Sequence, residues 1–325
     1  MEYEIDDIAL QLPEELIPPR FAEALHPFAR ERHGDGPVKG GASETGIRLG
    51  PNCAGLILEA ATGIQRAAQW HELHRFDFAD ADADCRFGRD AAGWLLEMSP
   101  RGKGGTVRFR YPPEDRPARC DYRTGIHPGL FRFGVWMLFN LAALTRSTVA
   151  IHASSIVYRG RALLFLGESG TGKSTHTRLW QEHIPGATLL NDDSPVIGCR
   201  GDEIRVWGSS WSGKCPCYRN ESHPAGAFIR LVQGPENRIR RLSPVEALGA
   251  LFPSTPPAFI RDAGLRDSVC SLLATVIARI PVYRLECRPD ADAARLVRHT
   301  LFGEGTPAGQ SSAAPYPAES TGRPH

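Results

Sequence analysis

The chain has 325 residues, of which 42% are hydrophobic and 23% charged, so it is globular and long enough for two domains of ordinary size. A formal net charge of +1 gives no indication of a nucleic-acid partner or an anionic membrane surface. Eight cysteines without zinc-site spacing are too sparse for a disulfide scaffold, and the acidic N-terminus lacks the apolar core of a signal peptide. We therefore expect a cytoplasmic protein.

The first part of the chain, residues 1–125, carries the weakest pattern. One strand is expected over residues 5–12. Two further β-type runs, 94–98 and 106–111, are separated by a glycine-rich segment that has the composition of a hairpin loop. We expect residues 1–125 to form a smaller accessory domain with β content.

The next part begins with an apolar helix over residues 130–144, which is shorter than the ~20 residues that span a bilayer. A strand over 148–158 follows, and Arg159-Gly160 forms a tight turn into a strand ending at Leu166. Strands joined by two residues are antiparallel neighbours. This arrangement brings His152 toward the end of the sheet where residues 167–174 begin.

Residues 167–174 read Gly-Glu-Ser-Gly-Thr-Gly-Lys-Ser and match the phosphate-binding pattern G-x-x-x-x-G-K-[ST] between a strand and a helix over 175–183. Glycines let several backbone N–H groups point at one anion, and the helix N-terminus adds partial positive charge. Lys173 is expected to reach the β- and γ-phosphates, and the Ser174 hydroxyl to bind Mg²⁺. The predicted nucleotide-binding residues are Gly167, Ser169, Gly170, Thr171, Gly172, Lys173, Ser174 and Thr175.

Two adjacent aspartates, Asp192 and Asp193, end a predicted strand that starts at residue 187. One helix and one strand separate them from Lys173, so they are expected to emerge beside the phosphate loop. One carboxylate can hold Mg²⁺ and the other can deprotonate an incoming hydroxyl. We assign the metal to Asp192 and the base to Asp193, and the reverse assignment stays open.

Residues 208–214, Gly-Ser-Ser-Trp-Ser-Gly-Lys, allow two interpretations. Lys214 is one of only four lysines in a chain with thirty-four arginines, which favours a second anion-binding loop with a catalytic Lys214. The alternative is a surface turn. The remaining predicted elements are strands over 227–233 and 282–287 and helices over 243–251, 269–277 and 290–302, followed by a disordered tail, 304–325.

His152, the loop 167–174 and the sequence Asn191-Asp-Asp together resemble the HPr kinase/phosphorylase family over residues 148–200. The resemblance implies an α/β fold with a mixed β-sheet P-loop core over residues 126–303, of the type shared with the phosphoenolpyruvate carboxykinases. It also implies ATP and Mg²⁺ as cofactors, and it places His152 near the transferred phosphate.

The function predicted from these observations is ATP-dependent transfer of a phosphate to a hydroxyl, with a serine of a protein or peptide as the favoured acceptor. A kinase for a small metabolite and a nucleotide-binding regulatory module with little turnover are the alternatives. Neither a nucleic acid nor a membrane is expected as a partner. Homo-oligomerisation and the choice between ATP and GTP stay open.

Overall fold

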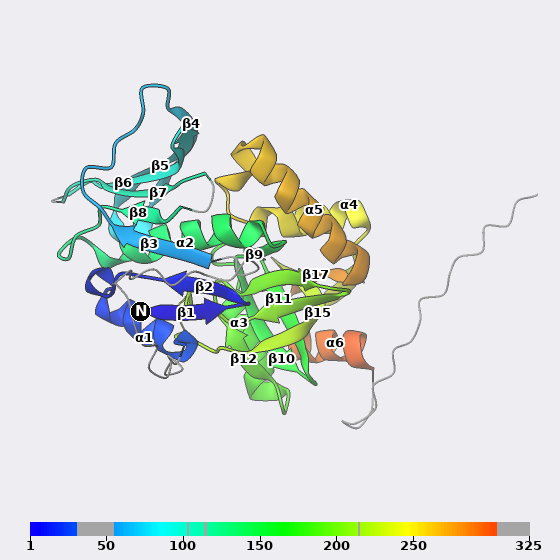
Figure 1. Cartoon of the computed structure of the whole chain (residues 1–325). Coiled ribbons are helices and arrows are strands. Elements are labelled where there is room, and N and C mark those ends of the chain that lie inside the picture. The colour runs from blue at the N-terminus through cyan, green and yellow to red at the C-terminus, as the bar shows by residue number, and fades with distance from the viewer. Residues whose placement is uncertain (31–54, 103, 114–115, 214, 304–325) are drawn as a thin grey trace, which may run out of the picture.

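A computed structural model describes residues 1–30, 55–102, 104–113, 116–213 and 215–303. The fold is mixed α/β, with two sheets and helices between and around them (Figure 1). The helices are α1 (Pro19–Leu25), α2 (Pro128–Leu144), α3 (Lys173–His183), α4 (Pro244–Leu251), α5 (Ala263–Arg279) and α6 (Ala291–Phe302). Five short 3-10 turns add η1 (Glu14–Leu16), η2 (His26–Phe28), η3 (Ala79–Ala81), η4 (Phe252–Ser254) and η5 (Phe259–Arg261).

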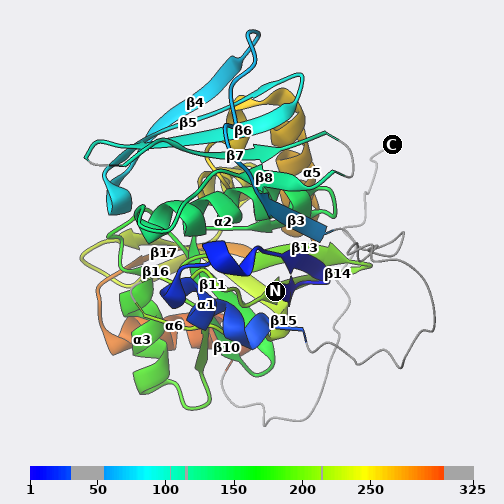
Figure 2. The same ribbon diagram turned by 60° about the vertical axis from the view of Figure 1, so that its left-hand side comes forward.

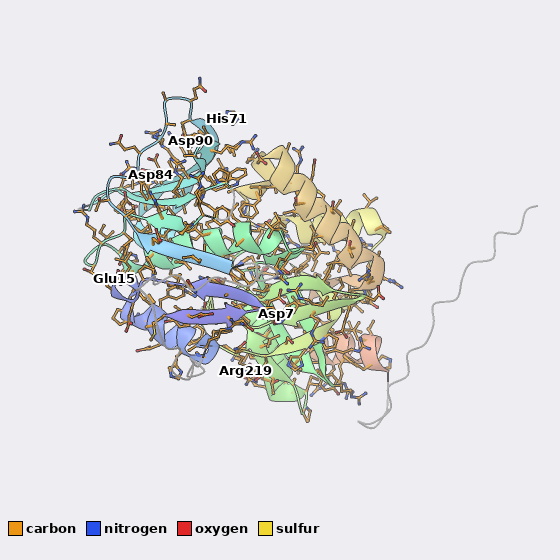
Figure 3. The ribbon with its side chains drawn as sticks, in the orientation of Figure 1. Asp7, Glu15, His71, Asp84, Asp90 and Arg219 are labelled. Carbon is orange, nitrogen blue, oxygen red and sulfur yellow. The ribbon has the colours of Figure 1, made fainter. Side chains whose placement is uncertain are left out.

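The first sheet has eight strands in the order β1-β2-β3-β8-β7-β6-β5-β4. Their bounds are β1 Glu2–Ile5, β2 Ile8–Gln11, β3 Gly55–Ala60, β4 His71–Phe78, β5 Ala83–Asp90, β6 Gly93–Pro100, β7 Val107–Tyr111 and β8 Ala118–Cys120. β3 is parallel to both of its neighbours, and the other pairs are antiparallel. β4 is the last strand and pairs with β5 alone among the described residues. In Figure 3, His71 marks the start of β4, and Asp84 and Asp90 lie on β5.

The second sheet has nine strands, seven of them in the order β12-β10-β11-β15-β14-β13-β9, with β17 beside β15 and β16 beside β17. Their bounds are β9 Thr148–Ala150, β10 Ala153–Tyr158, β11 Arg161–Leu166, β12 Thr188–Asn191, β13 Val196–Arg200, β14 Glu203–Trp207, β15 Ser222–Gln233, β16 Arg238–Arg241 and β17 Val282–Cys287. β15 is parallel to β11 and β17, so the sheet is mixed.

Side chains on the two faces of the second sheet belong to different cores. Along β11, Leu164 and Leu166 join the larger core, which also contains most of α2, whereas Leu163 and Phe165 join a smaller core with α3 and α6. This alternation is the period-two pattern of a strand buried on both sides. The phosphate-loop candidate therefore follows a strand fixed from both faces.

Helix α2 lies between the two sheets (Figure 2). Gly134 permits its close approach to β7, because a Cβ there would lie 2.2 Å from a ring carbon of Phe109. The larger core includes side chains from both sheets, for example Phe87 and Val149. The division of the chain near residue 125 stays a prediction. None of the described helices has both the length and the apolarity that crossing a membrane requires.

Two predicted strands are wrong in extent. Residues 5–12 form not one strand but the end of β1, a tight turn and β2, because Asp6 and Asp7 take positive φ angles of 56° and 54° and reverse the chain. The strand predicted over 148–158 is interrupted at Ile151 and His152. β9 pairs with β13, whereas β10 pairs with β11 and β12.

Candidate active site

The loop formed by residues 167–172 connects β11 to α3, so the strand and the helix predicted around it are confirmed. Gly170 and Gly172 have φ angles of 85° and 103°, a region that other residues rarely adopt. A Cβ on Gly167 would lie 2.2 Å from Oγ1 of Thr171, whose hydroxyl donates to the carbonyl of Glu168 at 2.8 Å. The loop therefore depends on its glycines for its shape.

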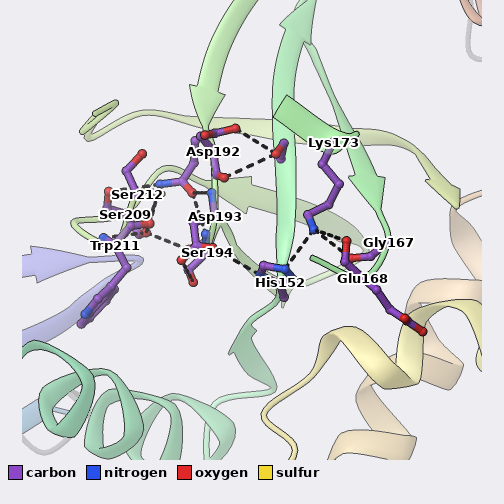
Figure 4. Close-up of polar contacts among 12 residues, drawn as sticks. His152, Gly167, Glu168, Lys173, Asp192, Asp193, Ser194, Ser209, Trp211 and Ser212 are labelled. Carbon is purple, nitrogen blue, oxygen red and sulfur yellow. Dashed lines mark hydrogen bonds and ion pairs between the residues drawn. The ribbon is translucent and has the colours of Figure 1, made fainter. Parts of the chain in front are cut away.

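Lys173, the first residue of α3, folds back over this loop. Its Nζ donates to the carbonyl oxygens of Gly167 at 2.8 Å and Glu168 at 3.1 Å, and it lies 2.9 Å from Nε2 of His152 (Figure 4). Burial lowers the pKa of the ammonium, while the nearby Asp193 carboxylate acts in the opposite direction. A buried ammonium held by carbonyl oxygens is positioned to exchange them for the oxygens of an anion.

His152 lies in the break between β9 and β10, where its backbone N–H donates to the carbonyl of Ser254 at 2.7 Å. Its Nδ1 is 3.3 Å from Oδ1 of Asp193. A charged Lys173 can only donate, so Nε2 of His152 accepts and Nδ1 carries the proton directed at Asp193. The imidazole thus connects the lysine of the glycine-rich loop with the second aspartate.

The adjacent aspartates contact different groups, because they follow the last residue of β12 and point to different sides. Asp192 is buried, and its carboxylate accepts from the Ser154 hydroxyl at 3.0 Å and from the Cys215 backbone at 3.2 Å. Asp193 is half-exposed beside His152 and accepts from the Ser194 hydroxyl at 3.2 Å. The structure thus brings His152, Lys173 and Asp193 together, as the sequence leads us to expect.

Asn191 positions this turn, a function that the sequence reasoning did not assign. Its Oδ1 accepts from the backbone N–H groups of Asp193 at 2.9 Å and Ser194 at 2.8 Å. Its Nδ2 donates to both oxygens of Ser209 and to the Trp211 carbonyl at 3.1 Å. The signal available in the sequence was an Asn before two aspartates, a residue type that caps turns in this way.

Residues 208–212 pack against the aspartate turn and are buried, which excludes a surface turn for this part of the segment. Ser212 accepts at its carbonyl from Arg132 of α2 at 2.7 Å, and Trp211 donates from Nε1 to the Arg132 carbonyl at 3.1 Å. Lys214 lies outside the described residues, as does the tail 304–325. The proposed role of Lys214 stays a prediction.

A magnesium ion fits the donors present. The described residues contain no cluster of three His, Cys, Asp or Glu side chains for a metal cage. Mg²⁺ beside a phosphate needs no such cage, because one or two protein oxygens, waters and phosphate oxygens complete its shell. Each Asp192 oxygen accepts one hydrogen bond and keeps a lone pair, and Ser174 offers its hydroxyl in the first turn of α3.

Two cavities flank these residues. The larger, about 530 Å³, has His152, Asp193 and Ser194 on one side and residues of β4, α2 and 253–258 on the others. The smaller, about 350 Å³, borders the glycine-rich loop and lies between Gly170–Gly172, Thr175 and the ends of β15 and β17. Both fall in the size range of small-ligand sites.

No protein-family model matches the chain, and no curated protein matches it. Among solved structures, the chain is similar to the HPr(Ser) kinase/phosphatase from Coxiella burnetii, with 16% sequence identity and a TM-score of 0.29. The match covers 48% of this chain and 99% of the other. A similarity at this level concerns the fold at most and assigns no role to any residue.

Proposed function

We propose that this protein is an ATP-dependent phosphotransferase that transfers the γ-phosphate to a hydroxyl, with a serine of a protein or peptide as acceptor. The observation that carries the proposal is the series of contacts Lys173–His152–Asp193. The imidazole of His152 contacts the lysine of the glycine-rich loop at one nitrogen and the Asp193 carboxylate at the other. Phosphoryl transfer requires a cation at the phosphates and a base at the acceptor, side by side.

In this proposal, the nucleotide phosphates bind at the backbone N–H groups of the loop and at the N-terminus of α3. Lys173 exchanges its contacts with the Gly167 and Glu168 carbonyls for oxygens of the β- and γ-phosphates. The smaller cavity, which includes Thr175 and Arg288, takes the nucleoside. Its position directly beside Gly170–Gly172 supports this arrangement.

Ser174 and Asp192 would hold Mg²⁺, which neutralises charge on the phosphate oxygens when bound. Asp193 accepts the proton of the acceptor hydroxyl as the bond from that oxygen to the γ-phosphorus forms. The bond between the γ-phosphorus and the bridging oxygen breaks, and ADP leaves. His152 holds the Asp193 carboxylate in place, and its Nε2 becomes free when Lys173 moves to the phosphates.

The test separates binding from chemistry with two variants. Lys173→Ala should weaken Mg-ATP binding in calorimetry by about tenfold or more, the effect of one charge-assisted contact. Asp193→Asn should retain nucleotide affinity and lower phosphoryl transfer by roughly 10² to 10⁴-fold, the range for a lost general base. Asp202→Asn, at an exposed aspartate on the turn after β13, is the matched control.

Equal Mg-ATP affinities in wild type and Lys173→Ala would refute the nucleotide-binding assignment. Tight nucleotide binding without transfer to any hydroxyl would instead identify a nucleotide-binding regulatory module.

A further inference from the structure

The larger cavity opens directly onto the groups that the proposed function places at the reacting hydroxyl. We propose that this cavity binds the residue next to the acceptor serine and selects a large apolar or aromatic side chain there. The inference rests on the proposed function, since it names the class of acceptor for the same site. His152 and Asp193 form one wall of the cavity, so an occupant is held next to the base.

The lining of the cavity also includes a series of mutually contacting aromatic rings from two distant parts of the chain. Phe76 and Phe78 of β4 contact Phe133 of α2, with ring centroids 5.8 and 4.8 Å apart. Phe133 in turn stacks on Trp136 at 5.6 Å. All four rings are only partly buried and line the cavity. Aromatic faces left partly open to a cavity gain most from an apolar or aromatic occupant.

The charges around the cavity argue against an anionic metabolite. Among the described residues, Arg132 is the single Lys or Arg of the lining, and its guanidinium already donates to the Ser212 carbonyl. Asp80 and Asp193 line the cavity, as does Asp77, whose charge is paired with Arg101. A sugar phosphate or an organic acid would meet more negative than positive charge there, whereas a neutral peptide with an apolar side chain meets no such repulsion.

The topology favours a peptide over a small molecule. β4 is the last strand of its sheet, and the outer edge of its backbone has no strand partner among the described residues. His74, Phe76 and Phe78 alternate along it and line the cavity. An extended peptide can run along such an edge while placing alternate side chains in adjacent pockets. At about 530 Å³ the cavity exceeds the volume of one side chain.

The experiment uses the full-length protein, Mg-ATP and an oriented library of acetylated heptapeptides with a central serine and one varied flanking position. Phosphoserine is quantified by mass spectrometry. We expect Phe, Trp or Leu at one flanking position to be enriched about tenfold or more over Gly and Asp, the discrimination of a hydrophobic pocket. Phe133→Ala and the milder Phe76→Leu should lower that enrichment. Trp94→Ala, a partly buried aromatic of the same sheet outside the cavity, should retain it.

Enrichment is a ratio between peptides, so partial unfolding of a variant does not imitate a change in selectivity. Equal phosphorylation whatever the flanking residue, or an enrichment that Phe133→Ala leaves intact, overturns the proposal while the phosphotransferase stands. Phosphorylation of a panel of sugars, polyols and nucleosides, with no peptide phosphorylated, also overturns it.

As a readout independent of transfer, a heptapeptide with benzoylphenylalanine beside serine should cross-link to β4 or α2. Cross-linking there without phosphorylation would support the pocket and reject the phosphotransferase.

Discussion

Asn191 makes five hydrogen bonds from a fully buried position, and these hold the aspartate turn and residues 209–211 together. Its role follows from the two ends of one amide group. The oxygen shapes the turn that carries Asp193, and the nitrogen fixes the neighbouring buried loop. A residue that touches no substrate can thereby set the position of the proposed base.

We predict that Asn191→Ala destabilises the fold by about 1–3 kcal/mol, the cost of leaving buried polar groups without partners. It should also lower phosphoryl transfer by about tenfold or more, because the turn that positions Asp193 loses its support. Unfolding in urea and steady-state turnover measure the two effects separately.

The chain offers a matched control in Asn140, which is also fully buried and bonds with both ends of its amide. Asn140→Ala should cost comparable stability, yet spare turnover at temperatures where the protein stays folded. If the two variants lose turnover equally, Asn191 acts through general stability alone.

The hairpin of β10 and β11 is the element that brings His152 and the glycine-rich loop to the same end of the sheet. Arg159 and Gly160 at its turn have φ angles of 50° and 74°. For Arg159 this conformation is unfavourable, and its guanidinium lies over the ring of Tyr158, 5.4 Å from the ring centroid. Gly160 adopts it without a steric penalty, so the tight connection depends on glycine at this position.

Gly160→Ala should therefore destabilise the protein by about 1–2 kcal/mol, the cost of a left-handed conformation for a residue with a Cβ. Gly249→Ala in the exposed face of α4 should instead stabilise it by up to about 1 kcal/mol, because alanine favours helix there and meets no neighbour. Guanidinium unfolding curves distinguish these opposite signs. A stabilising Gly160→Ala would show that the turn is not under this constraint.

The elements that the sequence predicts well are those with strong local patterns. The apolar run expected over 130–144 forms α2, and the helix expected over 243–251 forms α4, which begins with a capping box at Ser243. β4 was not predicted, because its sequence, HELHRFDF, carries charges typical of a solvated segment. Charged side chains are common on strands at the edge of a sheet. The edge position of β4 depends on its pairing with β5 and therefore cannot be recognised from residues 71–78 alone.

At the scale of the whole molecule, the hairpin of β1 and β2 is joined to the second sheet by a buried carboxylate. Asp6 pairs with Arg200 of β13 and accepts from the Thr148 hydroxyl of β9 at 3.0 Å. Figure 3 shows the neighbouring Asp7 where this hairpin meets the second sheet. Burial raises the pKa of Asp6 to about 7, although Arg200 acts to lower it.

This pKa predicts how stability depends on pH. The pKa of Asp6 in the folded chain lies above its ordinary value of 3.8, so the folded state binds the proton more tightly than the unfolded state. Protonated Asp6 therefore stabilises the fold fully below its ordinary pKa of 3.8. This stabilisation is lost as the pH rises through the folded pKa of about 7. Urea unfolding should show a smaller loss between about pH 4 and pH 7 in Asp6→Asn than in wild type.

An exposed aspartate on another element supplies the control, since Asp267→Asn on α5 removes a carboxylate that does not act on Asp6 and should keep the pH dependence of the wild type. Parallel profiles for wild type and Asp6→Asn would mean that Asp6 titrates alike in the folded and unfolded chains.

The two parts of the candidate site differ in how far the sequence could predict them. His152, Lys173 and Asp193 lie within one short span whose strands and helix are read from local patterns, so their proximity could be expected. The aromatic cavity could not, because Phe76 and Phe133 meet only after a strand of the first sheet packs on α2. No pattern within a single segment of the sequence indicates that these two rings will be in contact.

This contrast has a consequence for how such proteins diversify. The proposed phosphate machinery lies in one uninterrupted stretch of chain, His152–Ser212, whereas the aromatic walls of the cavity come from β4 and α2, which precede that stretch. Replacement of β4 by a segment with other side chains would change the acceptor and leave the reacting groups untouched. A lineage can therefore acquire new acceptors by exchanging a piece of sequence that takes no part in the chemistry.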